Sequence, residues 1–380
     1  MSKAVSKEKP LRALLDKLDV DALVLMSPEN FAFASGLHIL TVNMIRPRQA
    51  FFILPKKGEP ELVLCSIELS LAKADGWVEK IHPYTEFVDH PMDVLAARLS
   101  ALGLEAATVG IDSDYLPLSS YERLVKNLPK LKLQNTTEAV SGVRVIKSRE
   151  EIAHIEWATR GTHQAVLDGM AQSKLGDSER DMCLRIASGI IRNGADGTAF
   201  LCFASGDRTP QSHAMASDRV PKESEIIRFD LGGAYGSYYS DFARTYSTGN
   251  PTATQKQAHA AVVKIQRAVI EAVRPGIAAE DLFFLTRDEF KKHNLPFTMP
   301  HIGHSFGIEL HETPMLRPGE KMKIQKGMIL NIEPTTSDGE GSKYHTEDLV
   351  EVTETGYRLM TLGFAPEEIP VIGQPIAQKA

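Results

Sequence analysis

Two stretches in the second half of the chain follow the same plan, and this repeat constrains the fold more than any other feature. Residues 225–249 read EIIRFDLGGAYGSYYSDFARTYSTG: an apolar strand, a carboxylate, a glycine-rich turn, a second carboxylate and another strand. Residues 327–356 read GMILNIEPTTSDGEGSKYHTEDLVEVTETG and repeat that order. Helical sequence precedes each hairpin. A duplicated domain whose hairpins meet would gather four carboxylates: Asp230, Asp241, Glu333 and Glu347.

Such a cluster needs compensating positive charge, because carboxylates at close range repel one another and take up protons. Divalent metal ions supply that charge, and carboxylates can bridge two ions about 3.5–4 Å apart. His304, between Gly303 and Gly307, adds an imidazole where a backbone without bulky side chains can approach a crowded site. Oxygen ligands with a single imidazole suit Mn²⁺, Co²⁺, Fe²⁺ or Zn²⁺. The pattern therefore predicts a two-metal site.

The segment around His304 also permits another interpretation. GHSFG matches G-x-S-x-G, the elbow that presents a nucleophilic serine on a sharp turn between a buried strand and a helix. Upstream, Pro296 and Pro300 argue against a central strand. Downstream, Pro314 and Pro318 interrupt any helix. We therefore expect Ser305 to be a neighbour of the reacting groups and not the nucleophile.

Composition limits the class of protein. With 380 residues and 43% hydrophobic content, the chain can bury two ordinary cores, so two domains are expected. The formal charge of −6, without a Lys/Arg-rich run, excludes a basic surface for nucleic acid. The three cysteines are scattered and lack CxxC spacing, which fits a reducing compartment. The N-terminus lacks an apolar signal, and no window of about 18 apolar residues occurs. We expect a cytoplasmic protein without a membrane partner.

The first part of the chain alternates strand and helix patterns. The runs DALVLM, QAFFIL, ELVLC and TVGID predict strands, and HPMDVLAARLSAL predicts a helix, which is α/β order. Near residue 147 a long amphipathic helix begins, with Ser148 and Glu151 placed as a capping box. We place the domain boundary there, which gives domains of residues 1–146 and 147–380.

A second strong helix is predicted in the duplicated part. It runs from about Thr254 to Val273, with Thr254 and Gln257 as its capping box. Ala258 and Val262 begin the apolar face that recurs along it. This helix would introduce the second half of the duplication.

The predicted ligands also carry a resemblance. Their order and surroundings resemble the pita-bread metallopeptidase family, which includes Xaa-Pro dipeptidases (prolidases), aminopeptidase P and methionine aminopeptidases, with creatinase as a metal-free relative. FDLGGAYGSYYSDFARTYSTG, GHSFGIELHETP, GMILNIEP and TEDLVEVTETG resemble its metal-site motifs. DALVLMSPENFAFASGL and RVIKSREEIAHI resemble the N-terminal domain and linker of the creatinase and prolidase branch. The resemblance implies a creatinase-like α/β N-terminal domain and an α+β pita-bread catalytic domain with pseudo-two-fold duplication.

The resemblance implies which residues would hold two ions. Asp230 would hold one ion and His304 with Glu333 the other, while Asp241 and Glu347 would bridge them. The ions would be Mn²⁺ or Co²⁺, with Zn²⁺ or Fe²⁺ as alternatives. A homodimer is also implied, and two-fold dimers are the commonest oligomers.

The resemblance also implies catalytic roles. Glu333 would shuttle a proton during hydrolysis. His213, in ASGDRTPQSHAM, and His311 match histidines that contact substrate and stabilise the tetrahedral oxyanion. These roles favour hydrolysis of a dipeptide or another small molecule.

Two departures leave the substrate open. Prolidases and aminopeptidase P commonly place a histidine where this chain has Pro300, and His301 stands one residue later. The same enzymes usually read Arg-x-Glu-Asp at the last ligand, where this chain has HTED with His345 in place of arginine. Three functions remain: an Xaa-Pro dipeptidase, a hydrolase of a small non-peptide amide or amidine like creatinase or an ectoine-type ring hydrolase, and a non-catalytic binding module.

Overall fold

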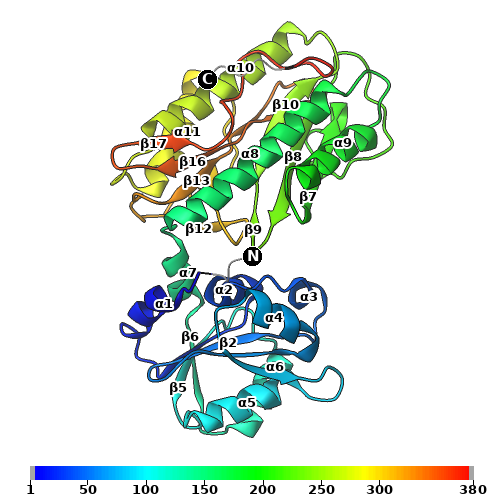
Figure 1. The fold of residues 1–380 in the computed structure, drawn as a ribbon. Coiled ribbons are helices and arrows are strands. Elements are labelled where there is room, and N and C mark those ends of the chain that lie inside the picture. Colours follow the sequence, from blue (N-terminus) through cyan, green and yellow to red (C-terminus); the bar gives the residue numbers. More distant parts are fainter. Residues whose placement is uncertain (1–4, 376–380) are drawn as a thin grey trace. The chain divides into compact units, whose positions relative to one another are not determined.

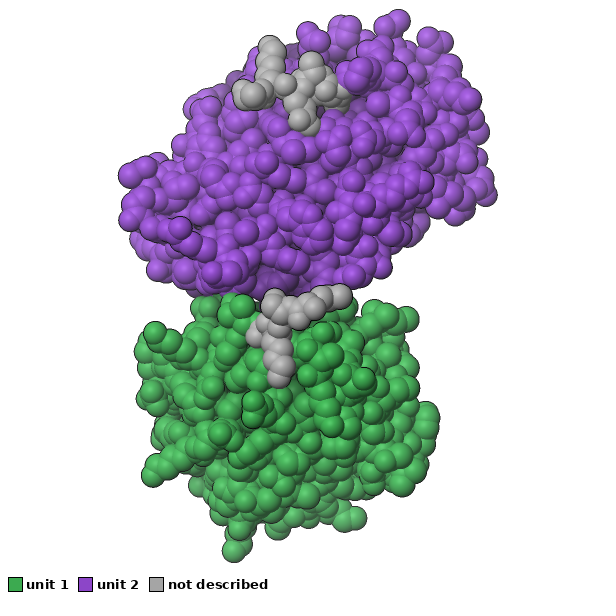
Figure 2. Space-filling model, in the orientation of Figure 1, with its two compact units in different colours: residues 1–144 green, residues 145–380 purple. Residues whose placement is uncertain are grey.

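The computed structural model describes residues 5–375 and divides into two compact units, residues 1–144 (unit 1) and residues 145–380 (unit 2), drawn in Figures 1 and 2. Each unit has hydrophobic cores of its own. The domain boundary between residues 146 and 147 stays a prediction. Within the described residues, none of the helices combines the length and the apolar character needed to span a bilayer.

Unit 1 is built on a six-stranded sheet of order β4-β3-β2-β1-β5-β6, in which β2 runs antiparallel to both neighbours and the other pairs are parallel. Its strands are β1 (Ala22–Leu25), β2 (Phe51–Pro55), β3 (Glu61–Cys65), β4 (Lys80–Tyr84), β5 (Thr108–Ile111) and β6 (Lys132–Asn135). Its helices are α1 (Glu8–Leu15), α2 (Pro28–Ser35), α3 (Leu40–Met44), α4 (Leu69–Asp75), α5 (Pro91–Ala101), α6 (Leu118–Asn127) and α7 (Thr137–Arg144), with the short 3₁₀ helix η1 (Ser66–Glu68).

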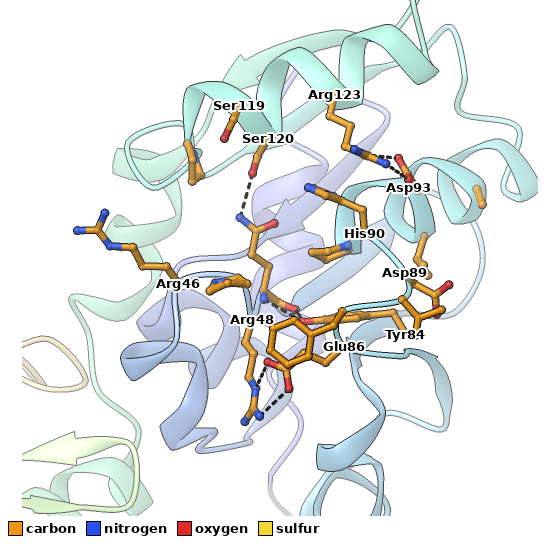
Figure 3. Close-up of a pocket in the computed structure, with 18 of the residues that line it drawn as sticks. Arg46, Arg48, Tyr84, Glu86, Asp89, His90, Asp93, Ser119, Ser120 and Arg123 are labelled. Atoms are coloured by element: carbon orange, nitrogen blue, oxygen red, sulfur yellow. Dashed lines mark hydrogen bonds and ion pairs between the residues drawn. The ribbon is translucent and has the colours of Figure 1, made fainter.

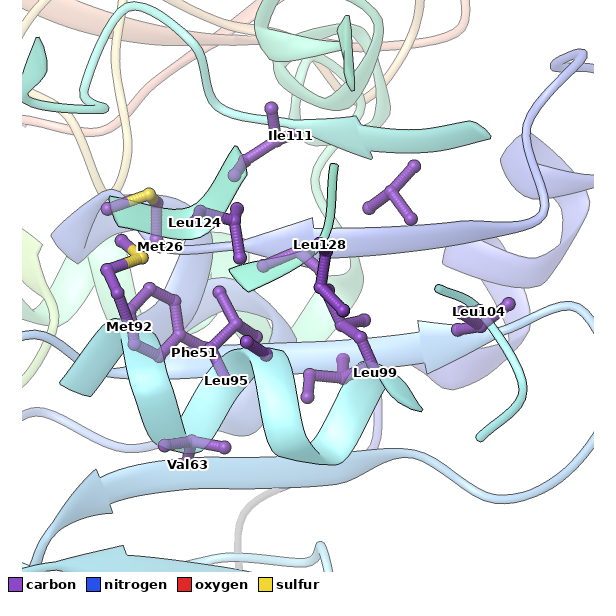
Figure 4. Packing of buried hydrophobic residues seen from close by; sticks show 14 of the residues in the cluster. Met26, Phe51, Val63, Met92, Leu95, Leu99, Leu104, Ile111, Leu124 and Leu128 are labelled. Atoms are coloured by element: carbon purple, nitrogen blue, oxygen red, sulfur yellow. The ribbon is translucent and has the colours of Figure 1, made fainter. Parts of the chain in front are cut away.

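The central strands of this sheet are apolar throughout because both faces are covered. Val24 of β1 belongs to the core that includes Leu95 and Leu99 of α5 and Leu124 of α6 (Figure 4). Its neighbour Leu23 points to the opposite face and is also fully buried. Parallel sheets covered on both sides have this near-continuous apolar pattern. The α/β order predicted for the N-terminal part is therefore confirmed.

Unit 2 contains two main sheets and a short ribbon. One sheet has the order β10-β8-β7 with β9 paired to β8, the other has the order β12-β11-β13-β16-β17, and β14 pairs with β15. The strands are β7 (Gly197–Ser205), β8 (Ile226–Tyr235), β9 (Tyr238–Tyr239), β10 (Phe242–Ser247), β11 (Gly303–Ser305), β12 (Glu312–Met315), β13 (Ile329–Ile332), β14 (Thr335–Ser337), β15 (Lys343–His345), β16 (Asp348–Val352) and β17 (Tyr357–Leu359). The helices are α8 (Arg149–Ala171), α9 (Glu179–Arg192), α10 (Ala253–Ala272) and α11 (Ala279–Lys292), with the 3₁₀ helix η2 (Gly206–Arg208).

The two sheets repeat one plan, as the sequence predicts. Helices α8 and α9 share a core with β8 and β10. Helices α10 and α11 share another core with β13 and β16. A helix pair therefore precedes and covers each carboxylate-bearing hairpin (Figure 1). The predicted α+β fold with an internal duplication is confirmed for the second unit.

One of the two predicted helix caps is correct and the other is wrong. Ser148 and Glu151 form the capping box of α8. Helix α10 is capped two residues earlier than predicted, by Thr252 and Gln255. The sequence TATQKQ allows both registers, and the earlier one gains a further hydrogen bond, from the Gln255 side chain to the carbonyl of Ser224 at 3.1 Å. This tertiary contact explains the difference.

The two halves of unit 2 are joined beside the hairpins. The Thr245 hydroxyl on β10 donates to the carbonyl of His345 and accepts from its backbone N–H, both at 2.9 Å. The Arg244 guanidinium reaches the carboxylate of Asp348 and the carbonyl of Glu347. Arg244 and Asp348 are both buried. This ion pair therefore fixes one carboxylate-bearing strand against the other.

We predict that Arg244→Met destabilises unit 2 by about 3–5 kcal/mol, because it leaves the Asp348 carboxylate buried without its partner. The double variant Arg244→Met/Asp348→Leu should recover most of this loss. Urea unfolding, monitored by circular dichroism, measures the free energy of unfolding of each variant. Arg180→Met is the matched control, since its ion pair with Asp218 is exposed and contributes about 0–1 kcal/mol. If Arg244→Met and Arg180→Met lowered the free energy of unfolding equally, the role of the buried pair would be contradicted.

Candidate metal centre

Three of the four predicted carboxylates lie next to the ends of paired strands, and the fourth lies within a strand. Asp230 is in β8, and Asp241 directly precedes β10. Ile332 of β13 pairs with Asp348 of β16, so Glu333 and Glu347 follow and precede these paired strands respectively. The two hairpins meet beside the Arg244–Asp348 and Thr245–His345 contacts that join the two halves of unit 2.

The carboxylates are close together in space. The ligand oxygens of Asp230, Asp241 and Glu347 all lie within 4.8 Å of one another. Ligand atoms of Glu333, His345 and Glu347 form a second group within the same limit. Glu347 belongs to both groups, which is the arrangement expected of a bridging residue.

The carboxylates of the cluster have raised pKa values, because like charges lie close together and away from water. Burial, with the carboxylates of Asp230 and Glu333, raises the pKa of Asp241 well above its usual range. The pKa of Glu347 is raised in the same way, by burial and then by Asp241. Burial and the charge of Asp230 raise the pKa of Glu333 to about 8. Burial also raises the pKa of Asp230. The protein alone would hold protons here, whereas nearby cations would let the carboxylates ionise.

His304 directs its Nε2 toward these carboxylates, and Nδ2 of Asn331 lies 3.4 Å from the same nitrogen. His304 lies in β11, fully buried, and its Nδ1 donates to the carbonyl of Ser305 at 2.9 Å. Its Nε2 is 3.6 Å from Glu333 Oε1 and 3.8 Å from Asp241 Oδ2. Burial lowers the pKa of His304 to about 3, so the ring is neutral. A neutral imidazole with its other nitrogen donating to a carbonyl is suited to hold a metal ion.

Glycine allows β11 to approach its neighbour this closely. Gly303 has φ +152°, and a Cβ built there would lie 1.9 Å from the carbonyl oxygen of Asn331 on β13. Any side chain at Gly303 would push these strands apart and move His304. The glycine-flanked histidine predicted from the sequence therefore has a steric basis.

The donor set fits divalent cations. Glu333 Oε1 and Glu347 Oε2 are buried and have no hydrogen-bond partner among the described residues. Buried polar atoms are nearly always partnered, so such atoms need an explanation. Oxygen ligands with one imidazole are typical of sites for Mn²⁺, Co²⁺, Fe²⁺ or Zn²⁺. The orphaned oxygens are where bound cations would be expected.

Of the two predicted substrate histidines, His311 lies beside the cluster. His311 is exposed, and the centroid of its ring is 4.0 Å from that of His304. Burial lowers the pKa of His311, while Asp230 raises it. His213 is exposed, and its charge lowers the pKa values of Asp230 and His311.

Sequence reasoning gave no role to four residues that contact the cluster. Asn331 Nδ2 donates to Glu347 Oε1 at 2.6 Å. His301 Nδ1 is 3.5 Å from Glu333 Oε1. The remaining two, Arg228 and His345, contact each other. A polar residue inside an apolar strand, as in IIRFD or MILNIE, is the signal that could have identified Arg228 and Asn331.

Ser305 is not placed as an elbow nucleophile. It lies in β11, and the chain continues to β12 without a helix. Its hydroxyl accepts from Lys147 Nζ at 3.1 Å, and the same Nζ pairs with Glu312 at 2.9 Å. Lys147 and Glu312 are buried. The serine belongs to a buried ion-pair network that braces β11.

Unit 1 has a cavity of its own, of about 1080 Å³, shown in Figure 3. Two of the arginines that line it are paired with acids, Arg48 with Glu86 and Arg123 with Asp93. The residues that line it include none of those predicted to bind metal or act in catalysis. The candidate chemistry therefore lies in unit 2.

Comparison with known proteins gives consistent matches. Residues 153–354 match metallopeptidase family M24, and residues 9–146 match the creatinase/prolidase N-terminal domain. The chain is 31% identical to a probable dipeptidase PepE of Mycobacterium tuberculosis over 86% of each chain. It is 27% identical to an Xaa-Pro dipeptidase of Pyrococcus horikoshii, covering 93% of this chain and 96% of the relative. The crystal structure of the prolidase from Pyrococcus horikoshii OT3 matches with a TM-score of 0.82 and 26% identity, over 93% of this chain and 97% of that one.

These matches span both units, and the M24 match alone covers more than half of the chain. They agree with the duplicated fold and with the clustered carboxylates and imidazole. The resemblance seen in the sequence is confirmed: this chain belongs to metallopeptidase family M24 and carries a creatinase/prolidase N-terminal domain.

Proposed function

We propose that this protein hydrolyses Xaa-Pro dipeptides with two divalent cations held between the hairpins of unit 2. The observation that carries the proposal is the convergence of four buried or half-buried carboxylates on Nε2 of His304. The relatives named Xaa-Pro dipeptidase and prolidase support the substrate class.

Each ligand has a proposed place. Asp230 would hold one cation, and His304 with Glu333 the other, while Asp241 and Glu347 would bridge. When bound, the cations supply Lewis acidity toward a carbonyl oxygen and make water acidic near neutral pH. We propose Mn²⁺ or Co²⁺ for this role, because the ligands are mostly oxygen.

The side chains around the cations would handle protons and substrate. Glu333 would take up a proton from the attacking water and return it to the leaving amine. Without cations its pKa is raised to about 8, first by burial and then by the charge of Asp230, and bound cations would lower it. His311, next to His304, and His213 would donate hydrogen bonds to the tetrahedral oxyanion.

Assembly and compartment are further parts of the proposal. We propose a homodimer, which light scattering of the purified protein would test. We also propose a cytoplasmic location, because the free cysteines Cys65, Cys183 and Cys202 fit a reducing compartment.

The first prediction here concerns metal content. Wild-type protein loaded with Mn²⁺ should bind close to two ions per chain, and Asp241→Asn or Glu347→Gln should lose both, because a bridging carboxylate serves each ion. Elemental analysis after gel filtration measures this. Glu354→Gln is the control, since Glu354 is exposed and pairs with Lys326. A wild type without metal, or bridging variants that keep both ions, would contradict the ligand assignment.

The second prediction separates the histidine from the serine. His311→Ala should keep both ions and lower kcat by about 10²–10³, the usual effect of removing an oxyanion donor. Ser305→Ala should change kcat only slightly, because its hydroxyl faces Lys147. Steady-state kinetics on metal-loaded protein distinguish them. An inactive but folded and metal-loaded Ser305→Ala variant would favour the serine nucleophile instead.

The third prediction concerns substrate. The Mn²⁺ form should cleave Ala-Pro or Met-Pro, with lower turnover of dipeptides that lack proline in the second position. Amine release across a panel of dipeptides, cyclic amides and guanidino amides measures this. Pro300 and His345 depart from the prolidase pattern, so small amides are the alternative substrates that the panel must include. Turnover of a cyclic or guanidino amide without cleavage of any dipeptide would transfer the assignment to the small-amide hydrolases.

A further inference from the structure

His345 is a buried histidine of β15 with a fixed orientation. Its backbone N–H and carbonyl both bond to the Thr245 hydroxyl at 2.9 Å. Its Nδ1 lies 3.1 Å from Nη2 of Arg228, and its Nε2 lies 3.6 Å from Oε2 of Glu333. The ring therefore spans the space between a guanidinium of the first half and a carboxylate of the second.

Arg228 determines which ring nitrogen of His345 carries the proton. An arginine side chain has five donors and no acceptor, so Arg228 donates to Nδ1, which must be unprotonated. The neutral ring then carries its proton on Nε2. If Nδ1 carried the proton, its N–H would point at an N–H of the positively charged Arg228 guanidinium, and the two would repel each other. The contact thus selects the Nε2–H tautomer of His345.

His304 has the opposite arrangement. Its Nδ1 faces the carbonyl of Ser305, which leaves the lone pair on Nε2. Metal-binding histidines almost always donate their second N–H to an acceptor in this way. Nδ1 of His345 lies 3.8 Å from Oδ2 of Asp230, too far for a hydrogen bond, and 3.1 Å from Nη2 of Arg228. Its Nε2 therefore carries the proton and has no lone pair to offer. Its proximity to Glu333 and Glu347 therefore does not make it a ligand.

We propose that His345 is a positioning residue for Glu333: Arg228 fixes its tautomer, and its Nε2–H donates to the Glu333 carboxylate. The 3.6 Å separation between Nε2 and the carboxylate is beyond a hydrogen bond, and the backbone of Glu333 is a second hydrogen-bonding group close to the ring. Hydrogen bonds of this kind tighten when substrate is bound. The inference rests on the proposed function, in which Glu333 moves the proton.

The pair also explains one departure from the family pattern. Relatives with Arg-x-Glu-Asp place a guanidinium where this chain has His345. Here a guanidinium comes from the other hairpin, and Arg228 Nη2 also lies 3.7 Å from Asp230 Oδ2. Arg228 Nη1 donates to the carbonyl of Ser212 at 2.8 Å, which holds the guanidinium in place. Arg228 and His345 together connect Asp230 to Glu333.

Nitrogen-15 NMR of histidine-labelled protein tests the tautomer directly. In both the metal-free and the Zn²⁺-loaded wild type, the signal of His345, assigned by its loss in His345→Gln, should show protonated Nε2 and bare Nδ1. The Nε2 signal of His304 should shift when Zn²⁺ binds. A proton on Nδ1 of His345, or a metal-induced coordination shift at its Nε2, would overturn the proposal.

Two variants test the role. Glutamine at position 345 can accept from Arg228 and donate to Glu333, whereas leucine can do neither. Both His345→Gln and His345→Leu should keep two Mn²⁺ ions. The leucine variant should lose about 10–100-fold in kcat with little change in KM, the usual effect of removing a partner of a ligand, and glutamine should restore most of it. Loss of an ion in either variant, or a glutamine variant no better than leucine, would contradict the positioning role.

His259→Gln is the control, because His259 is buried outside the site and bonds the carbonyl of Pro366. It should leave kcat and metal content unchanged. The NMR tautomer and the ion count need no substrate. A protein with the predicted tautomer and two ions but no dipeptidase activity would therefore refute the proposed function and leave the assignment of His345 intact.

Discussion

The mutual repulsion of four carboxylates, two of them buried and two half-buried, is the constraint on which this structure depends. Burial raises the pKa of each one, and that of Asp241 rises well above its usual range. Four ionised carboxylates cannot remain together in the interior without nearby positive charge. Arg228 supplies one positive charge, 3.7 Å from Asp230, whereas the neutral ring of His304 and the amide of Asn331 add none. The site is therefore incomplete as protein alone, and divalent cations complete it.

The surrounding fold keeps this unfavourable cluster in one place. The buried pair of Arg244 and Asp348 holds the two hairpins together. Lys147 pairs with Glu312, whose carboxylate also accepts from the backbone N–H groups of Ile308 and Glu309 at 3.2 Å. These bonds order the loop that carries His311. A helix pair on each sheet supplies the apolar cores that offset the cost of burying charge.

The sequence predicts those parts of the site that local pattern encodes. The repeated strands, the four carboxylates and the glycine-flanked histidine are readable because each occurs within a short stretch of chain. The contact between Arg228 and His345 joins residues 117 positions apart, and no periodicity pairs them. The cap of α10 was misplaced for a related reason, since the contact of Gln255 with Ser224 decides between two registers of similar local sequence. Long-range polar contacts are therefore the part that only the folded chain reveals.

The central claim is that two cations compensate the carboxylates of the hairpins. Anomalous diffraction from a crystal of Mn²⁺-loaded protein, recorded on both sides of the manganese edge, tests it most directly. The account predicts two peaks about 3.5–4 Å apart, both next to Asp241 and Glu347, with only one of them beside His304. A single peak, peaks elsewhere in unit 2, or a peak bound to Nε2 of His345 would contradict it.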